Sequence, residues 1–399
     1  MVDYSRIGLD SGLPFGIIGG GQLGKMTAQS AATLGLSPLL LADNGRDTPA
    51  GACVEKAWEA GKNWDRRDEI GEFAKHLAGG VAICEFESIP LEILSFLELQ
   101  GVQLKPRSNV WRVAQDRVLE KELAERLGFP VPLYTEFHAG AKVLDDFPWP
   151  ARLKVRGGGY DGHGQVRVEN FEEALQAWNQ NLSCEPCILE EQVAFALEIS
   201  VIVARDEEGN VQVYGPIENI HRDGILHVSI FPARLIGFKY DLEDGTNMVR
   251  KQAIVMATQM AEELGVVGLL AVEMFVLPNG KVLFNELAPR PHNSGHWTID
   301  ACRFSQFDNL VRAACGLTLG NRCGAPVVML NLLGGEGYES LVRQVLTDGT
   351  PGLHQPHWYG KQFESGRVRK HGHVTFVRGM GIEDVRHPAF MEAVVPGLK

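Results

Sequence analysis

A glycine-rich turn between an apolar run and a helical pattern is the feature that most restricts how this chain folds. The short run Phe15–Ile18 leads into Gly-Gly-Gly-Gln-Leu-Gly at positions 19–24, and helical spacing follows through Lys25–Leu34. A second apolar run, Pro38–Ala42, ends at Asp43. A strand, a glycine turn, a helix and another strand make the βαβ unit of a parallel sheet. The sequence therefore predicts an α/β fold.

The remaining chain divides into segments of different character. A charged amphipathic pattern predicts one helix from Val113 to Gly128, where Gly-Phe-Pro ends it. Further elements are predicted as strands over Ala151–Val155 and Val211–Tyr214, a helix over Lys251–Leu264, and strands over Leu270–Val276 and Lys281–Asn285. We expect three parts: 1–112, 113–302 and 303–399.

Charge balance and apolar content restrict the class of protein. There are 38 Lys and Arg against 50 Asp and Glu, a net charge of −12. This argues against a nucleic-acid-binding protein, because affinity for polyphosphate backbones needs surplus cations. No stretch approaches the roughly 18–20 apolar residues of a membrane helix, and the N-terminal segment lacks the pattern of a signal peptide. The seven cysteines do not form a zinc-site pattern, so we expect reduced thiols and a cytoplasmic protein.

The glycine turn also has a functional interpretation. Gly19, Gly21 and Gly24 match the spacing of the dinucleotide-binding fingerprint, and Asp43 stands where a ribose-binding acid is expected. An NAD-dependent oxidoreductase is therefore one hypothesis. The same turn also suits another phosphorylated ligand or simply a tight strand-to-helix corner. The fingerprint alone does not decide between them.

A second glycine-rich segment follows cations on a predicted strand. Lys154 and Arg156 precede the loop from Gly157 to Gly164. A mobile flap over a triphosphate needs fixed charge beneath it and exposed amides in a flexible loop. The structural alternative is an ordinary hairpin loop. Triphosphate chemistry becomes the better interpretation if a magnesium site is also present.

Two acidic residues provide such a site. Glu273 and Glu286 lie at the ends of two apolar runs, 13 residues apart with a Pro-Asn-Gly turn between them. Adjacent antiparallel strands bring both carboxylates and the Asn285 amide together. Apolar strands rarely carry acids unless these are paired or bind a metal, and hard oxygen ligands suit Mg²⁺. The alternative is a pair of carboxylates on a solvated hairpin.

A dense polar segment follows immediately. Arg290-Pro-His-Asn-Ser-Gly-His-Trp297 contains an arginine, two histidines, an amide and a hydroxyl within eight residues. Arg290 offers bidentate anion binding, and the other groups offer directed hydrogen bonds. A buried structural network is the alternative. The position just after the predicted metal ligands favours a substrate site.

These motifs together carry a family resemblance. The strings are GGGQLG at 19–24, GGYDGHGQ at 158–165, NELAPRPHNSGHWT at 285–298 and SQF at 305–307. They resemble the 5-(carboxyamino)imidazole ribonucleotide synthases of the ATP-grasp superfamily, which act in purine biosynthesis. The resemblance implies an N-terminal Rossmann-like domain, a central ATP-grasp domain with a glycine-rich lid, and a small C-terminal domain. It implies that ATP and bicarbonate carboxylate 5-aminoimidazole ribonucleotide through carboxyphosphate, giving ADP and phosphate.

The resemblance also implies roles for individual residues. ATP contacts would come from Arg117, Lys154, Gly159, Tyr160, Asp161, Gly162, His163, Gly164, Gln165, Glu190, Glu191, Gln192, Val193, Glu198, His221, Asn285 and Glu286. The ribonucleotide would be held by Gly21, Gln22, Leu23, Glu85, His292, Asn293, Ser294, Lys361 and Arg369. Glu273 and Glu286 would hold Mg²⁺, and Arg290 and Lys154 would act in catalysis.

The chain departs from the family pattern at two places. His163 stands where relatives usually carry Lys or Arg, and a histidine is only partly charged near neutral pH. The segment from Lys361 to His373 is about two residues longer, so that either Arg367 or Arg369 is the phosphate ligand. A homodimer and the transfer of product to a separate mutase are implied as well.

Three other functions fit the sequence less well. A formate- or biotin-dependent ATP-grasp relative is disfavoured by the HNSGHW string. An oxidoreductase leaves Glu273, Glu286 and the flap without a role. A non-catalytic nucleotide-sensing module requires the metal pair to be dispensable.

Overall fold

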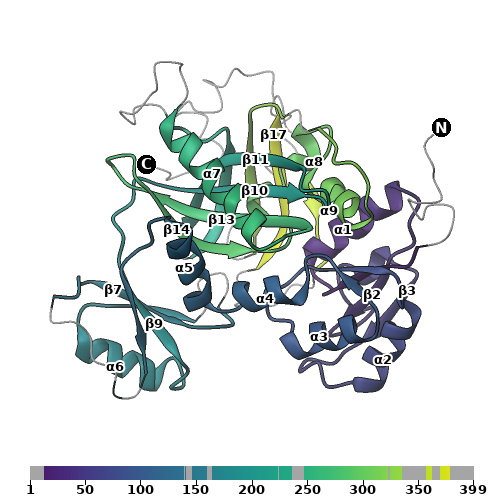
Figure 1. Cartoon of the computed structure of the whole chain (residues 1–399), viewed down its shortest axis with the longest axis horizontal. Helices are drawn as coiled ribbons and strands as arrows, with labels where there is room; N and C mark the ends of the chain where they lie inside the picture. The colour runs from purple at the N-terminus through teal and green to yellow at the C-terminus, as the bar shows by residue number, and fades with distance from the viewer. Residues whose placement is uncertain are drawn as a thin grey trace.

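The computed structural model describes residues 13–138, 140, 146–159, 164–222, 224–235, 247–321, 324–334, 356–361 and 369–377. These residues build three β-sheets covered by helices (Figure 1). The sheets have five, eight and four strands. Four lid positions predicted to contact ATP, namely Tyr160, Asp161, Gly162 and His163, lie outside the described residues, as does Arg367.

The five-stranded sheet is the parallel sheet that the glycine turn predicts. Its order is β3-β2-β1-β4-β5 and every pairing is parallel. The strands are β1 (Phe15–Ile18), β2 (Leu39–Ala42), β3 (Lys56–Glu59), β4 (Val81–Cys84) and β5 (Gln103–Leu104), and the helices are α1 (Gln22–Thr33), α2 (Arg67–His76) and α3 (Leu91–Leu99). The strands β1 and β4 are buried throughout, as expected where helices cover both faces of a parallel sheet.

The helix predicted from Val113 to Gly128 is wrong in its extent, because the chain forms two helices here. They are α4 (Ser108–Ala114) and α5 (Arg117–Arg126). Asp116 lies between them in an extended conformation, and its side chain accepts hydrogen bonds from the amides of Val118 and Leu119. An aspartate in this position satisfies amides that a new helix leaves unpaired. The N-cap therefore starts a second helix where periodicity indicates only one.

The four-stranded sheet is antiparallel and forms a separate layer with one helix. Its order is β6-β9-β7-β8. The elements are β6 (Tyr134–Phe137), β7 (Ala151–Val155), β8 (Gln165–Val168), β9 (Cys187–Glu191) and α6 (Phe171–Gln180). Phe137, Leu153 and Trp178 belong to its own small core. This layer carries Lys154 and Glu190.

The eight-stranded antiparallel sheet is the centre of the molecule. Its order is β14-β13-β10-β11-β12-β15-β17-β16. The strands are β10 (Leu197–Arg205), β11 (Val211–Arg222), β12 (Ile225–Phe231), β13 (Gly268–Val276), β14 (Val282–Ala288), β15 (Val327–Leu333), β16 (His357–Trp358) and β17 (Lys370–Val377), and the helices are α7 (Met248–Glu263), α8 (Thr298–Ala301) and α9 (Gln306–Ala314). Because β12 pairs with β15, the last strands continue the central sheet.

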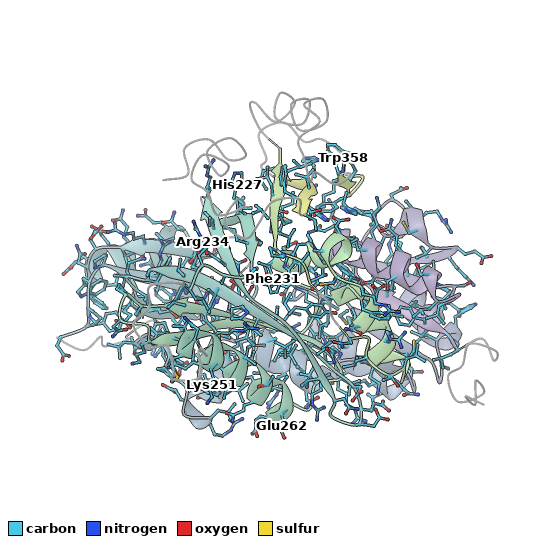
Figure 2. The ribbon with its side chains drawn as sticks, turned by 90° about the horizontal axis from the view of Figure 1, so that it is seen from above. His227, Phe231, Arg234, Lys251, Glu262 and Trp358 are labelled. Carbon is cyan, nitrogen blue, oxygen red and sulfur yellow. The ribbon has the colours of Figure 1, made fainter. Side chains whose placement is uncertain are left out.

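Helices cover both faces of this sheet. Alternate residues of a strand point to opposite faces, and β10 follows this rule: Val201 and Val203 join the core under α7, whereas Ile202 joins the core that contains α9. Lys251 and Glu262 lie on the exposed side of α7 (Figure 2). On the other face α9 packs against α1. Ser30 of α1 donates a hydrogen bond of 2.6 Å to Asp308 of α9, so the N-terminal part is attached next to the site described below.

Candidate active site

Two carboxylates on adjacent strands face each other near one edge of the central sheet. Glu273 of β13 and Glu286 of β14 are register partners. A bulge lies beside them, because Met274 pairs with Phe284 and leaves Asn285 as an extra residue of β14. A bulge redirects side chains locally. The structure thus brings together the two carboxylates that the sequence predicts to be neighbours. Asn285 directly precedes Glu286 in the chain.

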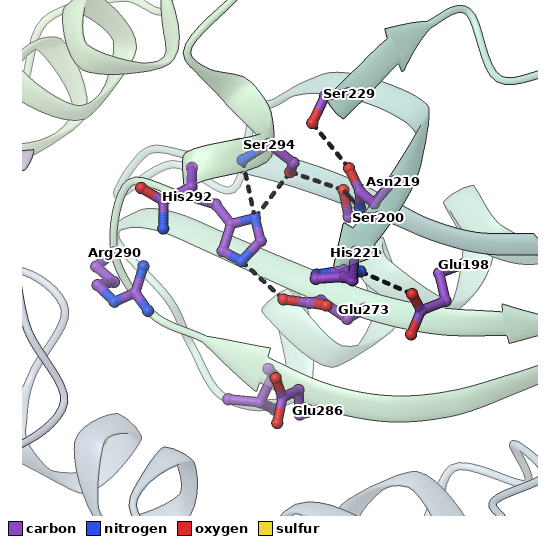
Figure 3. A network of polar contacts seen from close by, with 12 residues as sticks. Glu198, Ser200, Asn219, His221, Ser229, Glu273, Glu286, Arg290, His292 and Ser294 are labelled. Carbon is purple, nitrogen blue, oxygen red and sulfur yellow. Dashed lines mark hydrogen bonds and ion pairs between the residues drawn. The ribbon is translucent and has the colours of Figure 1, made fainter. Parts of the chain in front are cut away.

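Each carboxylate has a partner from outside the strand pair. Glu273 Oε1 lies 2.8 Å from His292 Nε2 (Figure 3). Arg117 Nη1 donates to Glu286 Oε2 at 2.8 Å. Burial acts to raise the pKa of Glu273, but the adjacent His292 outweighs it and holds that pKa well below its usual value. Glu273 is therefore an anion that faces a donor.

The oxygen atoms gathered here fit a divalent cation. Asn285 Oδ1 is buried and has no hydrogen-bond partner among the described residues. A buried acceptor without a partner is costly, and a bound ion would remove that cost. Carboxylate and amide oxygens are the ligands that Mg²⁺ takes from proteins. The donor set of Glu273, Asn285 and Glu286 is therefore suited to this ion.

A buried chain of hydrogen bonds orients His292. Ser229 Oγ donates to Asn219 Oδ1 at 3.0 Å, and Asn219 Nδ2 donates to Ser200 Oγ at 2.9 Å. Ser200 Oγ lies 2.7 Å from Ser294 Oγ, which in turn lies 2.7 Å from His292 Nδ1 (Figure 3). Because the serine hydroxyl occupies Nδ1, the Nε2 atom of His292 is left to face the carboxylate of β13.

A second imidazole–carboxylate pair lies on the neighbouring strands. His221 Nδ1 of β11 lies 2.7 Å from Glu198 Oε2 of β10. Burial lowers the pKa of His221, but the hydrogen bond to Glu198 and the charges of Glu198 and Glu273 raise it above the ordinary value. Two residues predicted to contact the nucleotide are thus adjacent. Their role toward ATP stays a prediction.

Two lysines share one buried glutamate on the four-stranded layer. Lys154 Nζ of β7 and Lys121 Nζ of α5 each contact one carboxylate oxygen of Glu190 on β9. Burial acts to raise the pKa of Glu190, but the two ammonium groups lower it to about 2. Burial lowers the pKa of Lys154. The cluster carries one positive charge in excess when all three are ionised, so it offers an anionic ligand a net cation.

The described residues of the predicted lid and of the predicted ATP-contacting segment Glu190–Val193 adjoin the strands β7 and β9, which carry this cluster. Gly159 and Gly164 flank the four lid residues outside the described ranges, and Gln165 starts β8. In the segment Glu190–Val193, Glu191 accepts a hydrogen bond from the amide of Leu133 at 2.9 Å, and Gln192 accepts one from Arg152 at 2.7 Å. Val193 follows directly after them. The predicted adenine segment is therefore held by its side chains at the end of β9.

The amides of the first glycine turn are bonded to a carboxylate of the protein itself. Glu85 follows β4 and accepts hydrogen bonds from the amides of Gly21 and Gly24, the second at 2.8 Å. Its side chain is buried, and burial raises its pKa. In a dinucleotide-binding enzyme these amides bind the pyrophosphate. Their use by Glu85 argues against the NAD hypothesis.

Residues predicted to contact the substrate converge from distant segments. Gln22 Nε2 of α1 donates to Asn293 Oδ1 at 3.3 Å. Leu23 packs with Phe307 in a small apolar cluster. Arg290 forms an ion pair with Glu87. These contacts join the turn after β1, the loop after β4 and the polar segment after β14.

Lys361 and Arg369 come to the same region from the C-terminal part. The charge of Lys361 acts to lower the pKa of Glu85, so the two lie within electrostatic range. Burial and then the charges of Lys361 and Arg369 lower the pKa of His371. The two predicted phosphate ligands thus lie near one histidine.

The sequence alone did not identify three charged residues of this region. Lys121 and Glu120 lie on the buried side of α5, and Glu87 pairs with Arg290. Glu120 Oε1 accepts from the amide of Leu287, next to Glu286, at 3.0 Å, and burial raises its pKa to about 8. Acids and lysines at buried helix positions are uncommon. Charged residues on the predicted buried side of this helix could therefore have pointed to Glu120 and Lys121.

Models of known families match most of the chain. Residues 14–115 match the ribonucleotide synthetase preATP-grasp domain, and residues 122–307 match the ATP-grasp domain. Residues 327–384 match the phosphoribosylaminoimidazole carboxylase C-terminal domain. The ATP-grasp fold that the motifs predict is confirmed.

A comparison of whole chains decides the family. The N5-carboxyaminoimidazole ribonucleotide synthase of Bacillus subtilis is 38% identical over 374 residues, which cover 92% of this chain and 92% of the relative. This chain belongs to the N5-carboxyaminoimidazole ribonucleotide synthase family. A second family member, from Brucella melitensis, is 36% identical over 379 residues and covers 94% of this chain and 98% of its own length.

Solved structures of N5-carboxyaminoimidazole ribonucleotide synthases share the whole architecture. The synthetase of Thermus thermophilus is 35% identical with a TM-score of 0.79, over 96% of this chain and 99% of the other. The Aspergillus clavatus enzyme, in complex with ADP and 5-aminoimidazole ribonucleotide, is 25% identical with a TM-score of 0.83, over 96% and 98%. None of the described helices is long and apolar enough to cross a membrane.

Proposed function

We propose that this chain is the ATP-dependent ligase that carboxylates the exocyclic amine of 5-aminoimidazole ribonucleotide with bicarbonate. The observation that carries the proposal is the opposed pair Glu273 and Glu286, next to the polar segment that begins at Arg290, with a buried Asn285 oxygen that finds no hydrogen-bond partner in the described part of the chain. Membership of the synthase family supports the same reaction. The product would be 5-(carboxyamino)imidazole ribonucleotide, formed in purine biosynthesis.

The reaction proceeds in two displacements. An oxygen of bicarbonate attacks the γ-phosphorus of ATP, the bond to the β-phosphate oxygen breaks, and ADP leaves with carboxyphosphate formed. The amine nitrogen then attacks the carboxyl carbon of carboxyphosphate, or that of the CO₂ which carboxyphosphate releases. In both cases the carbon–oxygen bond to phosphate breaks and the nitrogen loses its proton. Carboxyphosphate is short-lived in water, so a lid over the site is required.

The nucleotide is bound along the edge where the four-stranded layer meets the central sheet. Lys154 and Arg117 would neutralise phosphate oxygens, and the lid from Gly159 to Gln165 would cover them. The segment Glu190–Val193 would hold adenine, and Glu198 with His221 would hold the ribose. The Lys154–Glu190 contact supports this arrangement, because Glu190 holds the ammonium group of the lysine in place.

Magnesium would be held by Glu273 and Glu286, with Asn285 beside them. When bound, the ion neutralises charge on the phosphates. The chain supplies the remaining control: His292 and Arg117 hold the two carboxylates in position at 2.8 Å each. The buried serine and asparagine chain fixes the ring of His292 in turn.

The ribonucleotide would lie between the glycine turn and the polar segment. Arg290 would bind bicarbonate and then carboxyphosphate, and His292, Asn293 and Ser294 would surround the imidazole. Gly21, Gln22, Leu23 and Glu85 would contact the nucleotide from the other side, and Lys361 and Arg369 its phosphate. The Gln22–Asn293 hydrogen bond supports a shared site, because it joins the two sides.

Further parts of the proposal concern the protein as a whole. We propose domain boundaries near residues 112 and 302, a cytoplasmic homodimer, and transfer of the product to a separate mutase. Sedimentation equilibrium tests the dimer: a single species at the monomer mass of 43.8 kDa across micromolar concentrations would contradict it.

A coupled assay of ADP release tests the reaction. We expect ADP only when ATP, Mg²⁺, bicarbonate and 5-aminoimidazole ribonucleotide are all present. Glu286→Gln should lower kcat by at least about a hundredfold, since one electrostatic contact to a transferring group is worth about 10²–10³ in rate. Glu262→Gln, an exposed glutamate of α7 (Figure 2), is the matched control and should keep full activity.

Two results would contradict the proposal. One is ADP release that does not depend on the aminoimidazole ribonucleotide. The other is full turnover by a folded Glu286→Gln variant, with the fold checked by circular dichroism.

A further inference from the structure

A cluster of two histidines and an aspartate lies outside the residues assigned above. Asp300 of α8, His357 of β16 and His373 of β17 come from three segments that are distant in sequence. One potential ligand atom of each lies within 4.8 Å of those of the other two. His357 and His373 are register partners, and their rings stack with centroids 4.5 Å apart.

The aspartate of this cluster is ionised and held in place. His357 Nε2 lies 3.1 Å from Asp300 Oδ1 and 3.0 Å from Oδ2. The hydroxyl of Thr375 donates to Oδ2 as well. Burial acts to raise the pKa of Asp300, but these hydrogen bonds and the nearby imidazole of His357 lower it. The cluster therefore holds a fixed negative charge.

His373 presents a buried nitrogen that nothing in the described structure uses. The residue is 0% exposed. Its Nδ1 lies 2.8 Å from the hydroxyl of Tyr359, whereas Nε2 has no hydrogen-bond partner among the described residues. Burial, followed by the charge of His357, lowers the pKa of His373 to about 3, so the imidazole is neutral. When Nδ1 carries the proton toward Tyr359, Nε2 carries a lone pair.

We propose that Asp300, His357 and His373 bind a divalent transition-metal ion of the zinc type, separate from the magnesium site. Two imidazoles, which are neutral when they bind a metal, and one carboxylate form a ligand set that zinc takes in proteins, with solvent in the remaining position. The ion would accept the lone pair of His373 and neutralise Asp300. Thr375 and Tyr359 would then hold the ligands in orientation, as outer groups do in metal sites.

The site requires only a small adjustment to close on an ion. Zinc–nitrogen bonds of about 2.0–2.1 Å at tetrahedral angles put ligand atoms about 3.3 Å apart, against the present limit of 4.8 Å. His357 is the ligand placed to move, because it lies on a two-residue edge strand and its side chain is 29% exposed. The next residue, Trp358, lies at the surface (Figure 2), and the partly exposed side chain of His357 is itself within reach of solvent ions.

An ion here would connect three parts of the fold. The helix α8 follows directly after the polar segment that ends at Trp297, and β16 and β17 flank Lys361 and Arg369 in sequence. The backbone of Trp358 also accepts a hydrogen bond of 2.8 Å from Lys25 of α1. Binding of zinc would therefore stabilise the C-terminal strands against the body of the protein.

Zinc titration of untagged, chelator-treated full-length protein tests the proposal. The titration is followed by isothermal calorimetry with excess Mg²⁺ present and no nucleotide, and metal content is measured by mass spectrometry after dialysis. We expect one zinc ion per chain. Replacement by Co²⁺ should give visible absorption bands of a low-coordinate nitrogen and oxygen site.

Variants distinguish the cluster from other zinc-binding groups. His357→Gln should weaken zinc binding by more than about a hundredfold, because loss of an outer partner alone costs about 10–100-fold. Asp300→Asn should act in the same direction. His371→Gln, on the same strand two residues from His373, and Glu273→Gln, at the magnesium site, should keep the affinity of the unmodified chain.

The outcomes separate a metal site from an ordinary ion pair. Stoichiometric zinc binding that both cluster variants lose supports the proposal. Absence of stoichiometric binding, or equal affinity in folded His357→Gln and Asp300→Asn proteins, overturns it and leaves His357 and Asp300 as a structural ion pair. Melting temperatures measured without metal show whether each variant is folded.

Discussion

Burial decides how single side chains behave in this protein. His227 of β12 is an example: burial and then the charge of Arg222 lower its pKa to about 4. For Glu190 the balance is reversed, because the charges of two lysines lower its pKa more than burial raises it. No local sequence pattern distinguishes these histidines or glutamates from exposed ones. Their chemistry depends on burial and on charged neighbours that the fold supplies, such as Lys121 and Lys154 around Glu190.

The lowered pKa of His227 predicts a dependence of stability on pH. An unfolded histidine takes up a proton near pH 6.5, whereas the folded one does so near pH 4. Between these values the unfolded state binds more protons, so stability falls as the pH falls. The slope should be smaller than the limit of about 1.4 kcal/mol per pH unit, because solvent partly screens the residue.

Urea unfolding at pH 6.5 and pH 4.5 measures this effect. The loss of stability over the interval should be smaller in His227→Asn than in the unmodified chain. His76→Asn, at an exposed histidine of α2, serves as the control. Equal losses in all three proteins would show that His227 does not contribute.

The chain of hydrogen bonds behind His292 gives a second residue-level prediction. Ser200→Ala removes the oxygen between Asn219 and Ser294, and both partners lie buried. Leaving buried polar groups unpaired costs about 1–3 kcal/mol each. We expect the free energy of unfolding to fall by about 2 kcal/mol, measured by urea denaturation. Ser37→Ala, at an exposed position, should have little effect, and an equal change in both variants would refute the network's role.

At the level of secondary structure, apolar periodicity predicted the position of elements better than their extent. The strand predicted over Leu270–Val276 is β13, and the helix predicted over Lys251–Leu264 is α7, which starts three residues earlier. A strand predicted only at Val211–Tyr214 extends to Arg222 as β11. The residues beyond Tyr214 include Asn219 and His221. Their polar side chains interrupt the apolar pattern by which a strand is recognised in a sequence.

The candidate site was predictable where chemistry is concentrated in one segment. Most of the predicted site residues with reactive groups lie in the segment from Asn285 to Trp297, together with the acid Glu273. The register of β13 and β14 confirms that the carboxylates of Glu273 and Glu286 are neighbours. The bulge at Asn285 and the pairing of Glu87 with Arg290 were not predictable, because both depend on tertiary contacts. The residue roles themselves stay predictions.

An aromatic contact at its last residue helps to attach the polar segment to the sheet. Trp297 is fully buried, and its ring stacks on Phe231 of β12 with centroids 4.3 Å apart. Trp297→Ala should cost about 3–5 kcal/mol, as do other large-to-small changes in cores. Trp297→Phe keeps the stacked ring and removes an indole N–H that has no partner among the described residues, so it should cost far less. Similar thermal denaturation of the two variants would show that stacking is not what holds this segment.

At the level of the whole molecule, the site is assembled from every layer. The five-stranded sheet supplies Gln22 and Glu85, the four-stranded layer supplies Lys154, and the central sheet supplies Glu273 and Glu286. The net charge of −12 therefore does not describe the site, where Arg117, Lys154 and Arg290 gather. A ligand bound at this junction should stabilise all layers together.

Nucleotide binding tests this linkage. With Mg²⁺ and ATP at about 100 times the dissociation constant, the free energy of unfolding should rise by about 2.7 kcal/mol, seen as one shifted thermal transition. Removing Mg²⁺ with a chelator should abolish most of the shift, and Glu286→Gln should show little of it. A shift confined to one of two resolved transitions would contradict the linkage between layers.

The hydrogen bonds between Glu85 and the first glycine turn affect how an anionic ligand enters the site. It already occupies the amides of Gly21 and Gly24, so it acts as an intramolecular competitor for any incoming anion. Such an anion can accept hydrogen bonds from these amides only when the side chain of Glu85 changes its rotamer or takes up a proton. Affinity for the phosphorylated substrate should then increase toward acidic pH, and a glutamine at position 85 would weaken this proton coupling.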